Sequence, residues 1–190
     1  MRIIKQTIFV LAVFTIGLYS CKQSEKKQEI IIEEAPQGKG QSAVEAVEGA
    51  DPNALQVAAS LDNFSTLVVA VKAAGVEDAL VNVGPLTVFA PVNGAFDKLP
   101  EGTVETLLKP ESKEQLAFIL TNHVAPANYP IKQLKKEAKK GRKLYMASGK
   151  YLVVENKEDG VYVGGTKILK TVQVSNGWIH VIDNVLVPAE

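Results

Sequence analysis

The second half of the chain alternates short apolar runs with residue pairs that favour tight turns, and this alternation limits the fold more than any other feature. The turn pairs are Ser148-Gly149, Asp159-Gly160, Gly164-Gly165 and Asn176-Gly177. The runs between them, rich in β-branched and aromatic residues, cover 144–147, 151–155, 161–163, 168–174 and 178–187. Because each spacer is short, we expect consecutive strands to pair as antiparallel hairpins, with the last run as a central, buried strand.

The residues before this series carry helical patterns. Apolar residues recur at helical spacing after Asp51-Pro52 and again from Asn63 or Ser65 up to Gly75, which is a good helix stop. Further helices are predicted from Pro100 onward and over 112–123. Helices first and an antiparallel meander last predict one compact α+β domain over residues 51–190.

One buried strand is predicted among these helices. Residues 87–90 are β-branched, aromatic or apolar, and Pro91 should end the run. Asn93 follows and can cap a helix that places Phe96 under the strand.

Two segments resemble the sequence motifs of the fasciclin domain family. The first is TVFAPVNGAF at 87–96, with Val92 where the family usually has threonine, and the second is NGWIHVIDNVLVP at 176–188. Their order and separation also match, and the likeness spans about 53–188. The resemblance implies a wedge-shaped β-sandwich with flanking N-terminal helices. It also implies adhesion or ligand binding at cell surfaces and in matrices.

The N-terminus resembles a bacterial lipoprotein signal. Arg2 and Lys5 precede an apolar run at 8–18, and Ser20 stands directly before Cys21, the single cysteine of the chain. This run is too short to span a bilayer. We therefore predict a signal peptide at 1–20 and lipidation of Cys21, with an ordinary secretory peptide as the alternative.

Residues 21–50 are predicted to form a flexible, lipidated tether. They are rich in lysine, glutamate, glutamine and glycine, and they contain no aromatic residue, so they cannot bury enough apolar surface to fold. We expect the lipid to hold the protein in the bacterial outer membrane, facing the periplasm or the cell exterior.

A basic run is the one strong surface signal. The whole chain has 21 basic and 21 acidic residues, so its total charge gives no argument for nucleic acid. Seven cations nevertheless fall within twelve residues, opposed only by Glu137: Lys132, Lys135, Lys136, Lys139, Lys140, Arg142 and Lys143. The run is either a solvated helix face or loop, or a patch for an anionic glycan, a lipid headgroup or an acidic matrix or cell-surface protein. No aromatic residues are interleaved, which argues against nucleic-acid stacking.

No catalytic motif is present in the sequence, and the two histidines are the remaining candidates. His123 follows Asn122, where the family usually shows a Tyr-His pair, so the adhesion role attached to that pair is in doubt here. A functional interpretation would combine His123 and His180 with Asp97 or Asp183 as a metal or acid–base site. The structural interpretation, which we favour, has each imidazole bound to a buried carbonyl or hydroxyl. We predict no catalytic residue, metal or cofactor.

Three functions follow, in order of preference. The first is a non-enzymatic adhesion or ligand-binding module on the bacterial envelope. The second is a polysaccharide-binding accessory lipoprotein, which clustered carboxylates or an exposed aromatic platform would favour, and neither is evident. The third is a hydrolase using His123 and His180, which a deep cleft holding both histidines would favour.

Overall fold

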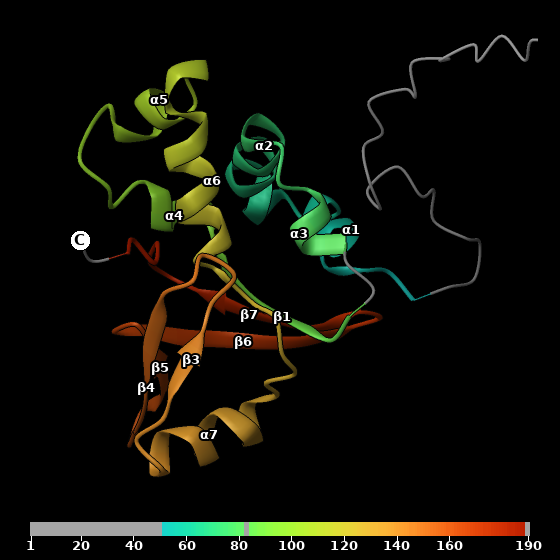
Figure 1. The fold of residues 1–190 in the computed structure, drawn as a ribbon, viewed down its shortest axis with the longest axis vertical. Coiled ribbons are helices and arrows are strands. Elements are labelled where there is room, and N and C mark those ends of the chain that lie inside the picture. Colours follow the sequence, from blue (N-terminus) through green and yellow to red (C-terminus); the bar gives the residue numbers. More distant parts are fainter. Residues whose placement is uncertain (1–50, 82–83, 189–190) are drawn as a thin grey trace, which may run out of the picture. The chain divides into compact units, whose positions relative to one another are not determined.

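The structure, a computed structural model, describes residues 51–81 and 84–188, so the predicted signal peptide, Cys21 and the tether lie outside the described residues. Helices predominate in the first part of this region and strands in the second, which confirms the α+β prediction (Figure 1). The helices are α1 (Ala54–Ala59), α2 (Ser65–Ala74), α3 (Asp78–Val81), α4 (Asn93–Phe96), α5 (Thr103–Leu107), α6 (Lys113–Thr121) and α7 (Ile131–Lys139), with the 3₁₀ turns η2 (Asp62–Phe64) and η3 (Pro110–Ser112).

Seven strands form one continuous ladder in the order β2-β1-β7-β6-β5-β4-β3. They are β1 (Leu86–Pro91), β2 (Val124–Ala125), β3 (Lys143–Tyr145), β4 (Tyr151–Lys157), β5 (Gly160–Val163), β6 (Thr166–Val174) and β7 (Gly177–Ile182). Strands β3 to β7 pair antiparallel in sequence order, and their turns fall at or directly beside the four predicted turn pairs. The predicted meander is therefore confirmed.

Strand β7 lies in the middle of the ladder, as expected, but it is shorter than predicted. It pairs with β6 on one side and runs parallel to β1 on the other, from Leu86 opposite Gly177 to Pro91 opposite Ile182. The sequence predicts a strand up to Val187, whereas the ladder ends at Ile182. Beyond Ile182, side chains at the end of α6 bind both backbone groups of Leu186, so this segment is attached to α6 and not to a neighbouring strand.

Because the last apolar run predicts a buried central strand, Trp178 and His180 are both expected to be core residues. For Trp178 this prediction is wrong, since its side chain is only half-buried. It stands at the start of β7 and lines a surface hollow together with Pro85 and Asn128. His180, two residues later on the same strand, is fully buried as predicted.

Two apolar clusters lie on opposite faces of β1 and β7. Val88 and Ile179 belong to the first cluster, which packs against α1, α2, α4 and α6. Phe89 and Ile182 belong to the second, which is completed by Leu134 of α7 and by side chains of β3, β4 and β5. Figure 1 shows β3, β4 and β5 running crosswise to β1, β6 and β7, with α7 on the side away from the other helices. The second cluster fills the space between these two halves of the ladder, which is the arrangement expected for a wedge-shaped sandwich.

The helix caps differ from the predicted ones. Asn53 begins α1, because its side chain accepts from the Gln56 N–H at 2.9 Å and the Gln56 side chain accepts from the Asn53 N–H in return. Asn93 does not cap its own helix. Its Oδ1 instead accepts from the Thr66 N–H at 3.1 Å, in the first turn of α2, and its amide donates to the Asp62 carbonyl at 2.9 Å. Asn93 thus attaches the segment after β1 to the start of α2.

Candidate functional site

His123 lies directly after α6 and is buried. Its Nδ1–H donates to the Ile119 carbonyl at 2.8 Å, and its Nε2 accepts from the Leu186 N–H at 2.8 Å, so the neutral ring has both nitrogens engaged. Burial lowers the pKa of His123 to about 4, against a smaller raising effect of the Ile119 carbonyl. The imidazole is therefore neutral at physiological pH and serves as a bridge between α6 and the segment after β7.

His180 has a similar role on β7. Its Nε2 contacts the Tyr129 carbonyl at 2.8 Å and its Nδ1 contacts the Thr171 hydroxyl at 2.9 Å, and its ring stacks on Phe89 with 5.4 Å between the centroids. Because a carbonyl only accepts, Nε2 carries the proton and Nδ1 accepts from the hydroxyl. Burial lowers the pKa of His180 as well. The structural interpretation of both histidines is confirmed.

Asn122 has a structural role that the sequence did not reveal. It is buried, its amide donates to the Leu186 carbonyl at 2.9 Å, and its Oδ1 accepts from the Ser148 hydroxyl at 2.9 Å. Asn122 and His123 together bind both backbone groups of Leu186. The pair therefore fixes a segment of the fold rather than pointing to solvent.

The predicted basic run begins in α7, a strongly amphipathic helix, and continues past the end of this helix to the first residue of β3. Ile131, Leu134 and Ala138 face the second apolar cluster, whereas the seven cations are exposed. Four of the lysines stand at helical positions i, i+3, i+4 and i+7 of α7, so one helix face brings them together. We call the exposed set the basic face: Lys132, Lys135, Lys136, Lys139, Lys140, Arg142 and Lys143.

Glu137, the one acidic residue in the run, does not neutralise this face. It is buried, it accepts from the Gln133 amide, and one of its carboxylate oxygens lies 3.7 Å from Arg142. Within the described residues, the lysines of the basic face take part in no ion pair. The face therefore carries at least six uncompensated positive charges.

Two tyrosines form an exposed aromatic pair on the outer side of the β3–β4 hairpin. Tyr145 and Tyr151 face each other across the two strands, with 5.3 Å between ring centroids, and are 49% and 62% exposed. Lys143 and Val153 form the next cross-strand pair on the same face. No aromatic platform is evident in the sequence, and the exposed tyrosine pair corrects that expectation. The two rings meet only because the Ser148-Gly149 turn aligns residues that lie six positions apart.

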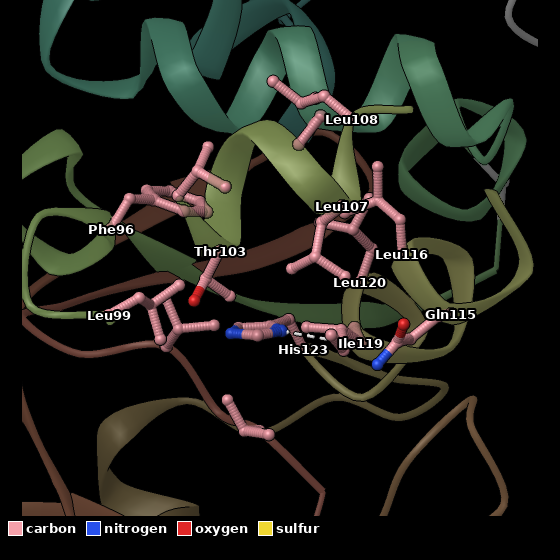
Figure 2. A pocket seen from close by; sticks show the side chains of 14 residues that line it. Phe96, Leu99, Thr103, Leu107, Leu108, Gln115, Leu116, Ile119, Leu120 and His123 are labelled. Carbon is pink, nitrogen blue, oxygen red and sulfur yellow. Dashed lines mark hydrogen bonds between the residues drawn. The ribbon is translucent and has the colours of Figure 1, made fainter. Parts of the chain in front are cut away.

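An apolar cavity of about 140 Å³ lies between α2, α4, α5, α6 and the segment after β7. Figure 2 shows its side chains, among them Phe96, Leu107, Leu116 and Ile119, with the His123 ring at its base. His180 is not among the lining residues, so this cavity does not bring the two histidines together.

Neither a metal site nor a membrane-spanning helix is found in the described region. No group of three His, Cys, Asp or Glu side chains within residues 51–81 and 84–188 is arranged to hold a metal ion. None of the helices in the same ranges combines the length and apolarity that crossing a membrane requires. The lipidation site predicted at Cys21 is not among the described residues.

Comparisons with known proteins agree with the fold. Residues 62–188 match the fasciclin domain. The chain is 40% identical to Protein sll1483 of Synechocystis sp. over 96% of its own length and 92% of that protein. It is 32% identical to the cell surface glycolipoprotein MPB83 of Mycobacterium bovis, over 57% of this chain and 46% of that one.

Among solved structures, a FAS1 domain pair from the insect cell adhesion molecule Fasciclin I has the same fold. The TM-score is 0.64 at 22% identity, over 72% of this chain. The chain spans about half of that domain pair, as expected for one of two domains.

Proposed function

Because the chain belongs to the fasciclin domain family, we propose that it is a non-enzymatic adhesion or ligand-binding module of the bacterial envelope. Two relatives support this proposal by their names, one being a cell surface glycolipoprotein and the other a cell adhesion molecule. Both histidines are already bound to backbone or hydroxyl groups within the fold, which disfavours the hydrolase alternative.

The proposal rests mainly on the basic face. We propose that this face binds an acidic polysaccharide. Four of the lysines lie on one side of α7, all six are free of ion pairs among the described residues, and the opposing carboxylate is buried. Like charges held this close repel one another, and a polyanion that bridges them removes the repulsion while gaining several attractions. Lysine side chains make few directional demands, so the face suits a repetitive polymer better than a single defined anion.

The test is the binding of the purified domain to acidic and neutral polysaccharides across a range of salt concentrations. Replacing Lys135, Lys136, Lys139 and Lys140 with glutamine should remove binding to the acidic polymer. Binding by the unmodified domain should weaken steeply above about 0.1 M salt, where the screening length falls below ~10 Å. The thermal midpoint should hardly move, because exposed substitutions usually change stability by no more than about 0.5 kcal/mol.

A matched control removes the same number of charges elsewhere. Lys72, Lys109, Lys113 and Lys150 are exposed and lie outside the basic face. Replacing all four of these lysines with glutamine should leave binding to the acidic polysaccharide nearly intact. If both variants lose binding equally, net charge alone drives association. If the unmodified domain and both variants bind equally well, the basic face is not the binding site.

The envelope location rests on Cys21 and is part of the same proposal. If Cys21 carries the lipid, changing Cys21→Ala should move the protein from the membrane fraction to the soluble fraction. A variant that still sediments with membranes after a high-salt wash would contradict the anchor.

The exposed tyrosine pair favours polysaccharide binding by stacking as a second candidate function. Tyrosine rings offer a flat apolar surface with a polar edge, which suits the apolar face of a sugar ring. Changing Tyr145→Ala or Tyr151→Ala should weaken binding to a neutral polysaccharide by ~10-fold or more. The Tyr→Phe variants should retain it. Binding that depends on the rings should also be insensitive to salt, which separates this mode from the basic face.

A further inference from the structure

We propose that the apolar cavity beneath α5 is a binding site for the end of an aliphatic chain. The proposal is independent of the basic face and of the tyrosine pair, since it concerns a different part of the fold.

The walls of the cavity are almost entirely hydrocarbon. Phe96, Leu116 and Ile119 contribute from α4 and α6, and Val185 contributes from the segment after β7. The His123 ring forms part of the base, yet both of its nitrogens are already hydrogen-bonded, so it adds no free polar group. An apolar cavity of about 150 Å³ in another protein binds benzene. The cavity therefore suits a hydrocarbon segment of about six carbons.

Helix α5 covers the cavity without filling it. It has only five residues and none of them is fully buried; Val104, Leu107 and the following Leu108 are half-buried along the cavity. Gly102 precedes the helix in a left-handed conformation, with φ 77°. A hydrocarbon ligand would bury these three side chains further, and this additional burial of apolar surface would stabilise the complex.

Two polar side chains line the cavity, the exposed Gln115 and the half-buried Thr103, and the Thr103 hydroxyl can receive the head of the ligand. The Thr103 hydroxyl points toward Leu99 and His123 at the cavity (Figure 2), and in the part of the chain that the structure describes no side chain or backbone group is hydrogen-bonded to it. A ligand with an apolar tail and a hydroxyl or carbonyl head would satisfy both the walls and Thr103. The cavity is partly open, so a longer chain could leave by the mouth.

The first experiment measures affinity for straight-chain primary alcohols with four to ten carbons. Burying one methylene should raise affinity about fourfold. We expect this increase up to about six carbons, followed by a plateau once the cavity is full. An affinity that rises equally up to ten carbons would indicate adsorption to exposed surface, and no saturable binding at all would overturn the proposal directly.

Matched tryptophan variants locate the site. Leu107→Trp should place an indole in the cavity and reduce hexanol affinity by at least about tenfold. Leu169→Trp makes the same change on β6, where Leu169 is exposed and does not line the cavity, and should leave affinity unchanged. Equal affinity in both variants would place the binding elsewhere.

A smaller change tests the same idea if Leu107→Trp does not fold. Thr103→Val keeps the shape of the side chain but removes the hydroxyl. It should weaken hexanol binding several-fold and leave benzene binding unaffected. Loss of both ligands, or of neither, would contradict the assigned role of Thr103.

Discussion

Gly177 is the residue on which the parallel pairing of β1 and β7 depends most directly. Its φ is 146°, and a Cβ built on it would lie 1.8 Å from the carbonyl oxygen of Leu86, its partner in β1. Both the backbone conformation and the space exclude a side chain. We expect Gly177→Ala to destabilise the domain by more than about 3 kcal/mol, measured from urea unfolding.

Gly94 provides the control for this prediction. It lies in α4, and a methyl group added there would meet no atom within 4 Å, so Gly94→Ala should be neutral or stabilise by up to about 1 kcal/mol. A similar unfolding midpoint for the two variants would show that β1 can move away from residue 177. The sequence predicted a turn at Asn176-Gly177, which is confirmed. It could not show why glycine is required there, because the obstacle is the backbone of a strand distant in sequence.

His123 should make stability depend on pH. In the unfolded chain its pKa is ordinary, near 6.5, whereas in the folded protein it is about 4. The unfolded state therefore binds the proton first as the pH falls, and stability decreases between about pH 7 and pH 4. The full effect of this one residue is about 3 kcal/mol, and burial lowers the pKa of His180 in the same direction.

The variant His123→Gln isolates this contribution. Glutamine does not titrate, so the loss of unfolding free energy between pH 7.5 and pH 4 should be smaller in the variant than in the unmodified domain by about 3 kcal/mol. Parallel pH profiles would mean that His123 is not the group responsible. The structural roles of the histidines were predictable because neither has a partner at metal-ligand spacing in the sequence. The role of Asn122 was not, because its partner Leu186 lies 64 residues further along the chain.

At the scale of elements, the sequence predicted the hairpins better than the helix starts. Turn pairs act over a few residues, so local chemistry decided where the chain turns between β3 and β7, although not where β7 ends. Asn93 has the right residue type to cap α4, yet its side chain caps α2 instead. Tertiary contacts determine which helix Asn93 caps, and a sequence pattern that covers a single helix contains no information about such contacts.

Helix α7 should be held in place by Leu134 and not by its lysines. Leu134 is fully buried in the second apolar cluster, whereas Lys136 on the same helix is exposed. Leu134→Ala should destabilise the domain by about 2–5 kcal/mol, and Lys136→Ala by no more than about 0.5 kcal/mol. Thermal unfolding of the two variants measures the difference. A small effect of Leu134→Ala would mean that α7 is attached too loosely to present a rigid basic face.

On the scale of the whole molecule, the two apolar clusters should unfold together. Strands β1 and β7 contribute alternate side chains to both clusters, so neither cluster survives the loss of these strands. Ile179→Val and Ile182→Val remove the same methylene from one strand, the first in the first apolar cluster and the second in the second apolar cluster. Each should lower the free energy of unfolding by about 1 kcal/mol, with one transition seen by both circular dichroism and Trp178 fluorescence. Two separate transitions in either variant would show that the clusters are independent.

The pairing of β1 with β7 also has a consequence for how the protein is made. When β1 leaves the ribosome, the partner strand that will cover most of it has not been synthesised, and β2 can pair with only two of its residues. At roughly 5–20 residues per second, several seconds pass before residue 177 appears. Throughout this delay the nascent chain cannot complete its sheet. We propose that the protein is exported, and for such a protein we expect the late closure of the sheet to help keep the polypeptide unfolded, which is the form that a narrow secretion channel accepts.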